Sequence, residues 1–151
     1  MDAVTYPDEK VAGFLNGSVI PVRLAFNAKP YAKDFTVMWT PTLITLDENG
    51  KEHYRTVGFL PPAELIPSVL MGIAKAHFDL NRLAEALAVM EQILAEHPRS
   101  KAAPEAVYYA GVARYKSTHD PKQLRAGYEK LAADYPASDW VERAYPYRLI
   151  Q

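Results

Sequence analysis

The hydrophobic pattern of this chain changes its period near Pro61. Before that point, two short runs, Thr42–Leu46 and His53–Val57, have the apolar and β-branched pattern of strands. The dipeptide Asn49-Gly50 lies between them and tolerates the positive φ angles that tight hairpin turns need. After Pro61, apolar residues recur at helical spacing only. The change predicts an α/β unit followed by an all-α unit.

Three further elements are expected before the hairpin. Apolar residues at helical spacing predict a helix over Pro7–Asn16, which Asn16-Gly17 would end. The dense apolar run Val19–Phe26 predicts a strand, in which Pro21 is tolerated only at an edge or a bulge. A short helix is expected over Tyr31–Phe35.

The all-α part contains an internal repeat. Pro98 and Ser100 recur as Pro136 and Ser138, 38 positions later. Pro67 is expected to bend or restart the first helix, because it cannot donate to the preceding turn. A self-similarity with a period near forty, in which each unit has two helices, resembles the tetratricopeptide repeat over residues 68 to 148. A small irregular helical bundle is the alternative.

The segment Met38-Trp39-Thr40-Pro41-Thr42-Leu43, with the hairpin that follows it, resembles the thioredoxin fold. The resemblance implies a cis bond before Pro41 and an open strand edge at which an extended peptide pairs. Trp39, Thr40 and Pro41 are therefore candidate peptide-binding residues. Trp39 has an alternative role, which is to pack against the first helix through Phe14.

The opening residues Met1 to Ala12 resemble the stretch that follows the C-x-x-C motif in thioredoxin-like proteins of the C-x-x-C-x-x-M type. On that alignment, both cysteines and the first core strand lie outside the chain. We therefore expect residues 1–62 to form an incomplete thioredoxin-like domain and residues 63–151 a tetratricopeptide-like helical region. Three explanations stay open: a missing upstream piece, which we favour, a fragment, or a scaffold that has lost its redox function.

A missing central strand would leave a vacant slot between Val19–Phe26 and the two strands of the hairpin, with unpaired backbone groups on both sides. If the chain is complete, re-pairing of the sheet, a borrowed strand or a homodimer would fill the slot.

The chain of 151 residues contains no cysteine, which excludes disulfides, thiolate metal sites and cysteine nucleophiles. The four histidines lie at no metal-ligand spacing, and no hydrolase motif or phosphate-binding glycine loop is present. We therefore expect no catalytic residues, no cofactor and no metal in the chain as given.

A formal net charge of −1 without a Lys/Arg cluster argues against nucleic-acid binding. No stretch approaches the roughly 20 apolar residues of a membrane span, so no membrane partner is expected. The chain as written is expected to be cytoplasmic. An upstream export signal would instead place the protein in a periplasm.

In a tetratricopeptide array, the first helices of the units line the concave binding surface. Lys75, Tyr109 and Arg114 lie on such helices and are candidates for contact with a protein partner, with an ordinary solvated face as the alternative.

Two functions are compatible with these sequence features. The first is a module that binds a protein or peptide without redox chemistry, and the second is a thiol–disulfide oxidoreductase whose C-x-x-C lies upstream of Met1.

Overall fold

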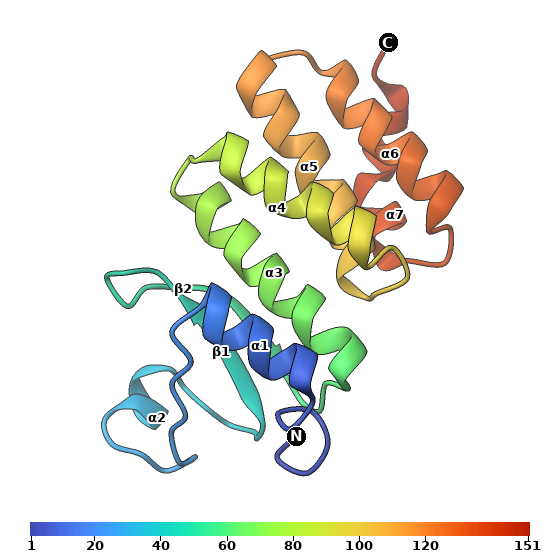
Figure 1. Ribbon diagram of the computed structural model, residues 1–151. Coiled ribbons are helices and arrows are strands. Elements are labelled where there is room, and N and C mark those ends of the chain that lie inside the picture. Colours follow the sequence, from blue (N-terminus) through green and yellow to red (C-terminus); the bar gives the residue numbers. More distant parts are fainter.

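The structure, a computed structural model, describes all of residues 1–151. A small α/β unit is followed by a stack of helices (Figure 1). In chain order the elements are α1 (Glu9–Ser18), α2 (Tyr31–Asp34), β1 (Thr42–Leu46), β2 (Glu52–Val57), α3 (Pro62–Asp79), α4 (Leu83–Glu96), α5 (Ala102–Thr118), α6 (Lys122–Asp134), α7 (Asp139–Ala144) and the 3-10 helix η1 (Tyr145–Leu149). No helix is both long enough and apolar enough to span a membrane.

Helix α1 begins at a side-chain cap. The carboxylate of Asp8 accepts hydrogen bonds from the backbone N–H groups of Lys10 and Val11, at 3.0 and 3.1 Å, which satisfies two donors of the first turn. The helix starts two residues later than the sequence predicts and continues through Gly17 to Ser18. Asn16-Gly17 is therefore not the end of the helix.

The hairpin has the predicted strands and a different turn geometry. One oxygen of Asp47 accepts hydrogen bonds from the N–H groups of Asn49 and Lys51, each at 2.9 Å. Gly50 alone takes a positive φ, at 78°. Asn49 does not, so the Asn-Gly pair forms a turn held by an aspartate rather than a two-residue turn with two left-handed residues.

The predicted strand over Val19–Phe26 is wrong. This segment follows α1 as an irregular extended chain, and the sheet has only two strands, β1 and β2. A strand is stable only with a neighbour to satisfy its backbone groups. Strand-forming side chains alone do not supply that neighbour.

Helix α3 runs through Pro67 without a break, so the helix does not restart there. Pro67 removes the hydrogen bond that the carbonyl of Ala63 would accept. Ala63 is exposed, so water can satisfy that carbonyl, and the helix continues.

Helix α3 packs against two partners at once, the hairpin on one side and α4 on the other (Figure 1). Its contact with β1 depends on Gly72, because a Cβ added there would lie 2.9 Å from the Cβ of Thr45. The predicted boundary between the two units, after residue 62, is not tested by the structure. Helix α3, which begins at Pro62, packs in both units.

The largest core cluster lies between α3, α4 and α5 and consists of Leu70, Met71, Ala74, Ala86, Met90, Ile93, Ala102, Ala103, Ala106 and Ala110. Six of these ten residues are alanines, which lets the three helices approach closely. Between α5 and α6, the backbone approach is closer still. A Cβ added at Gly111 would lie 3.4 Å from the Cα of Gly127.

Candidate binding surfaces

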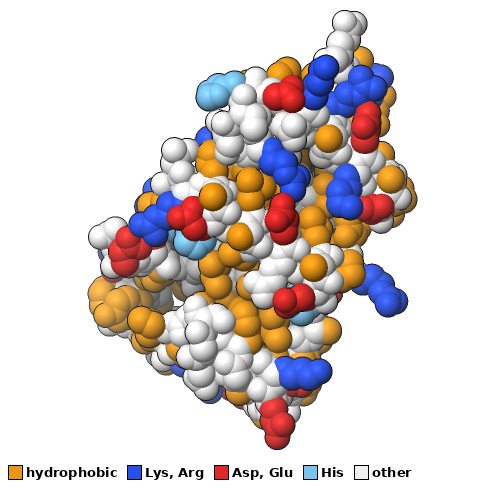
Figure 2. Space-filling view, turned by 45° about the horizontal axis from the view of Figure 1, so that its top comes forward, with side chains coloured by type: hydrophobic (Ala, Val, Ile, Leu, Met, Phe, Trp, Pro, Cys, Tyr) orange, Lys and Arg blue, Asp and Glu red, His pale blue; other side chains and the backbone are white.

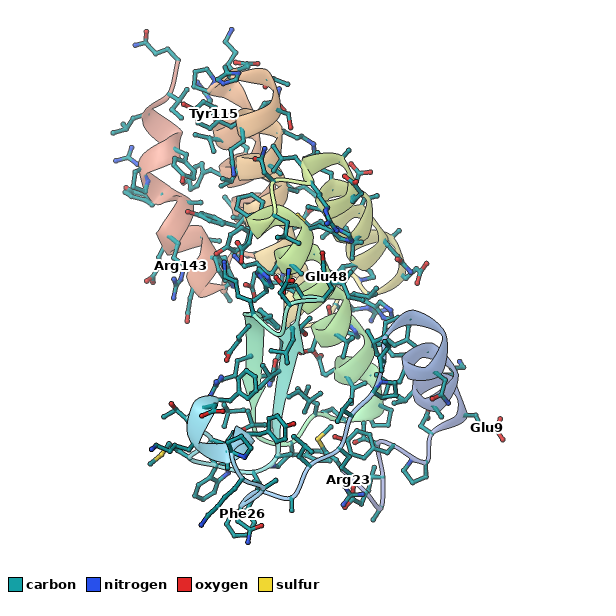
Figure 3. All side chains as sticks on the ribbon, turned by 90° about the vertical axis from the view of Figure 1, so that its left-hand side faces the viewer. Glu9, Arg23, Phe26, Glu48, Tyr115 and Arg143 are labelled. Carbon is teal, nitrogen blue, oxygen red and sulfur yellow. The ribbon has the colours of Figure 1, made fainter.

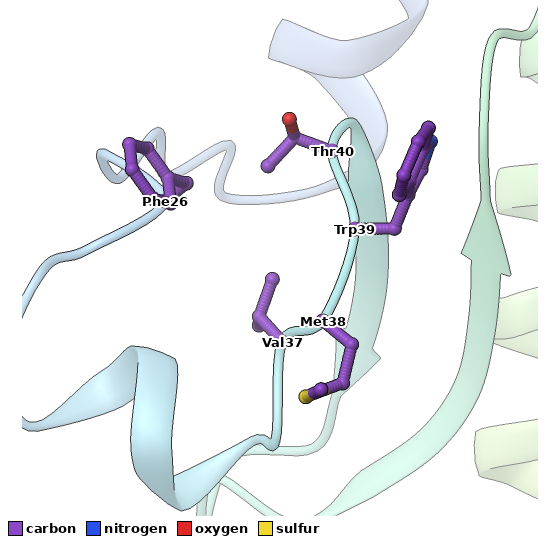
Figure 4. Close-up of a pocket in the computed structure, with 5 residues that line it drawn as sticks. All are labelled: Phe26, Val37, Met38, Trp39 and Thr40. Atoms are coloured by element: carbon purple, nitrogen blue, oxygen red, sulfur yellow. The ribbon is translucent and has the colours of Figure 1, made fainter.

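The first candidate surface is a hollow beside the segment that leads into β1. Five residues line it, Phe26, Val37, Met38, Trp39 and Thr40, and its volume is about 200 Å³. Phe26, from the chain after α1, faces Val37 and Thr40 across the opening, whereas Trp39 and Met38 point to the other side of the backbone (Figure 4). We call this the Trp39 hollow.

Short-range contacts fix the backbone of the Trp39 hollow. The hydroxyl of Thr42 donates to the carbonyl of Trp39 at 2.6 Å, and the N–H of Gly58 donates to the carbonyl of Pro41 at 2.8 Å. The Thr40–Pro41 bond is cis. Trp39 is 68% exposed, and Phe14 contacts the helical core. Trp39, Thr40 and Pro41 thus form a fixed backbone that carries an exposed indole.

The second candidate surface is built on helices α3, α5 and α7. The ammonium of Lys75 lies 3.8 Å from the ring centre of Tyr109. That ring meets Phe78 edge to face at 5.4 Å and Trp140 at 5.7 Å between ring centres. Four side chains from three helices therefore form one continuous surface, which we call the aromatic face.

Two more cations lie on the rings of the aromatic face. The ammonium of Lys116 is 4.6 Å from the ring centre of Phe78, and the guanidinium of Arg143 is 4.9 Å from that of Trp140. Both positions fit cation–π attraction, which acts within about 6 Å. Neither cation forms an ion pair with a carboxylate, so both remain available for an anionic group.

Arg114 does not belong to the aromatic face. Its guanidinium donates to the carboxylate of Glu91 on α4 at 2.9 Å. Arg114 follows Tyr109 by five residues, which places the two about 140° apart around the helix axis. The structure therefore brings together Lys75 and Tyr109, whereas Arg114 points toward α4, the second helix of the preceding unit.

A partly buried carboxyl group connects the aromatic face to the sheet. The hydroxyl of Tyr54 on β2 donates to Glu105 on α5 at 3.1 Å. Burial raises the pKa of Glu105, while the Tyr54 hydrogen bond and the nearby charges of Lys75 and Arg143 act in the opposite direction. Burial and the neighbouring Glu105 carboxylate also raise the pKa of Tyr54.

His53 makes a second connection between the hairpin and the helices. The pairing of β1 with β2 is irregular, with Thr45 opposite Tyr54 and Leu46 opposite Glu52, so His53 is an extra residue. Its fully buried ring bonds Asp79 at 2.9 Å and Asp47 at 3.1 Å. The hydrogen bonds to these two carboxylates, Asp79 first, raise the pKa of His53, and the bond to His53 is the main cause that lowers the pKa of Asp47.

The sequence interpretation missed several residues of the aromatic face. Phe78, Lys116 and Arg143 were not singled out, although helical spacing carried a signal for each. Phe78 is three residues after Lys75, Lys116 is seven after Tyr109, and Arg143 is three after Trp140. No group of three side chains of the metal-binding types is brought together in a way that could hold an ion.

Comparison with protein families agrees with this organisation. Residues 2–70 match the model of a thioredoxin-like domain, and residues 68–100 match that of a tetratricopeptide repeat. No curated protein and no solved structure matches the chain. The chain therefore joins a partial thioredoxin-like α/β unit to a helical region of tetratricopeptide type, and the two families together support a protein-binding module.

Proposed function

We propose that the chain binds an extended peptide segment of a protein partner at the aromatic face and that it performs no chemistry in doing so. The observation that carries this proposal is the set of rings and cations on α3, α5 and α7. Rigid rings offer large contact area at small entropic cost, and the cations add affinity for an acidic side chain or a terminal carboxylate.

Charge supports this kind of partner. Lys116 and Arg143 lie on rings and form no ion pair with a carboxylate of their own chain, whereas Arg125 and Lys130 are each paired with a carboxylate one turn away on the same helix. Two carboxylates lie next to the face: Asp79, whose oxygen is 3.9 Å from the ammonium of Lys75, and Glu105, which is held by Tyr54 and has a raised pKa. An acidic peptide would therefore meet an attractive potential along the aromatic face.

The Trp39 hollow is the second place at which we propose peptide contact. Its lining is mostly apolar and carries no charged side chain, so it suits one apolar side chain of the same or another peptide. Thiol–disulfide exchange needs a thiolate, and the chain has no cysteine. We therefore assign no redox step to these residues.

The test is a selection of random peptides on the full chain, followed by fluorescence anisotropy titrations of the enriched peptides. We expect acidic peptides whose affinity falls at least tenfold in Tyr109→Leu and decreases with salt. Arg114→Ala, on the same helix but outside the aromatic face, is the matched control and should bind as the wild type does.

Two other results are informative. A loss of affinity in Trp39→Ala alone would move the binding site to the Trp39 hollow and overturn the assignment to the aromatic face. A chain that enriches no peptide, or one that binds equally well in every variant, would overturn the proposed function.

A further inference from the structure

The carboxylate of Asp79 lies between two basic side chains, one in the hairpin and one on the aromatic face. Its Oδ2 atom is 2.9 Å from Nδ1 of His53, and its Oδ1 atom is 3.9 Å from the ammonium of Lys75. The same ammonium lies 3.8 Å from the ring centre of Tyr109. An unbroken series of polar contacts therefore leads from β2 to the aromatic face.

The protonation state of His53 decides whether both of its contacts are favourable. A protonated imidazole has two N–H donors, which satisfy Asp79 at Nδ1 and Asp47 at Nε2. A neutral imidazole has one N–H donor, so one of the two carboxylates then faces a ring nitrogen that carries a lone pair. The side chain of His53 has no exposed surface, so bulk water does not screen that repulsion.

Asp79 is the carboxylate that can leave a neutral His53. Asp47 is 4% exposed and accepts hydrogen bonds from the backbone N–H groups of Asn49 and Lys51, so it is held in place. Asp79 is 35% exposed and is the last residue of α3. Figure 3 shows the turn that holds Asp47, labelled at Glu48, at the end of the hairpin that reaches the helices.

Lys75 is the alternative partner of Asp79. It precedes Asp79 by four residues on α3, which is the spacing at which opposite charges on a helix attract one another. Asp79 therefore has two arrangements: it bonds a protonated His53, or it pairs with Lys75 when His53 is neutral.

The other charged groups around His53 are held in pairs. The bonds to Asp79 and then to Asp47 raise the pKa of His53, whereas burial acts in the opposite direction. Further charged groups of the hairpin and the adjoining helices are Glu48 with Arg82, Glu52 with Arg55, and Glu105 behind Tyr54. Among all these side chains, only the imidazole has an ordinary pKa close to neutral pH.

A single charge matters on this surface. The chain has a formal net charge of −1, and Figure 2 shows basic and acidic side chains interspersed over one face of the molecule. The cations on the rings of the aromatic face are Lys75, Lys116 and Arg143. Pairing of Asp79 with Lys75 would neutralise one of these three cations.

We propose that His53 and Asp79 are positioning residues for Lys75 and make the binding of an acidic peptide at the aromatic face dependent on pH. With His53 protonated, Asp79 is held by the hairpin, and Lys75 is free to contact the peptide. With His53 neutral, Asp79 pairs with Lys75, and the peptide binds more weakly. This inference rests on the proposed function, because its main readout is the affinity for such a peptide.

The test is a series of fluorescence anisotropy titrations of the full chain between about pH 5.5 and about pH 9. The probe is an enriched acidic peptide without histidine and with an acetylated N-terminus, whose carboxylates stay ionised in this range. The wild type should bind about two- to fivefold more tightly at the lower pH, which is the effect of one partly exposed ion pair. The midpoint should lie above 6.5, because the pKa of His53 is raised.

Two variants should fix the affinity at opposite levels. His53→Gln is neutral at every pH and should bind as weakly as the wild type does at high pH. Asp79→Asn cannot neutralise Lys75 and should bind as tightly as the wild type does at low pH. Loss of packing alone would weaken binding in both variants. His97→Gln, outside the aromatic face, is the matched control and should keep the pH dependence of the wild type.

A second measurement needs no peptide. In an NMR titration of the free chain, the Cε protons of Lys75 should shift with the same midpoint as the ring of His53, and this shift should vanish in Asp79→Asn. Three results would overturn the proposal: equal peptide affinity of the wild type at all pH values, a pH dependence that survives in His53→Gln, or Lys75 protons that do not follow His53. A chain that enriches no peptide at any pH would overturn the proposed function instead, and the Lys75 titration would still test the coupling.

Discussion

Gly72 of α3 lies against the side chain of Thr45 in β1, and no other residue fits that position without movement of the sheet or the helix. A Cβ added at Gly72 would lie 2.9 Å from the Cβ of Thr45. The contact joins the centre of α3 to the centre of the hairpin. The close packing of the α/β unit on the first repeat helix depends on this missing side chain.

We expect Gly72→Ala to destabilise the protein. Overpacking costs roughly 1–3 kcal/mol, which lowers the melting temperature by about 2–4 °C per kcal/mol for a chain of this size. Calorimetry or circular dichroism measures the change. Gly13→Ala is the matched control, because a Cβ there meets nothing within 4 Å and alanine favours the helix. Equal effects of the two variants would contradict the close contact.

The buried His53 predicts a defined dependence of stability on pH. The raised pKa of His53 stabilises the folded state fully below its ordinary value of 6.5, and this contribution is lost as the pH rises through the raised value. The lowered pKa of Asp47 stabilises the folded state above 3.8, and this contribution is lost as the pH falls through the lowered value. The contact should therefore be strongest between about pH 4 and 6.5.

The measurement is the melting temperature of the wild type and of His53→Gln at about pH 5.5 and about pH 8.5. The deficit of the variant should be larger at the lower pH. A deficit that does not change with pH would show that His53 stays neutral.

Tyr54→Phe should destabilise the protein by about 1 kcal/mol, because it leaves the partly buried Glu105 without its hydroxyl donor. The loss should be smaller in acid, where a protonated Glu105 no longer buries a charge. Urea unfolding at two pH values measures it. In the background of Glu105→Gln, the effect of Tyr54→Phe should shrink, and full additivity of the two changes would argue against the coupling.

The two tryptophans should differ in fluorescence. Trp39 is 68% exposed, whereas Trp140 packs on Tyr108 at 5.1 Å between ring centres. The Trp140→Phe protein should therefore emit at longer wavelength and be quenched more strongly by acrylamide than the Trp39→Phe protein. The Trp39→Phe change should also leave stability within about 0.5 kcal/mol of the wild type, as surface substitutions do. The reverse order of quenching would show that the Trp39 ring is not exposed.

The elements that local signals determine could be predicted from the sequence. The strand Thr42–Leu46 and the short helix near Tyr31 have the expected positions, and α4 and α6 each end two residues before one of the repeated prolines, Pro98 and Pro136. The failures came from contacts that are distant in sequence. Val19–Phe26 has the side chains of a strand but no neighbouring strand, and nothing local reveals that absence.

In the candidate sites, too, local signals could be interpreted from the sequence, whereas contacts between distant segments could not. The closeness of Lys75 and Tyr109 follows from the packing of the first helices of two successive units, α3 and α5, whereas the direction of Arg114 depends on where α4 lies. The position of His53 could not be foreseen, because a one-residue irregularity in the pairing brings its ring to Asp79. A strictly alternating strand would have placed it on the opposite side of the sheet.

Helix α3 packs against the sheet and is also the first helix of the helical stack. The two parts of the chain therefore share one helix, and no flexible linker separates them. Heat or denaturant should therefore melt both parts in one cooperative transition. A protease that cuts beside α3 should leave neither part folded. A ligand bound at one part would then lie at a fixed orientation to the other part, because the whole chain is one rigid body.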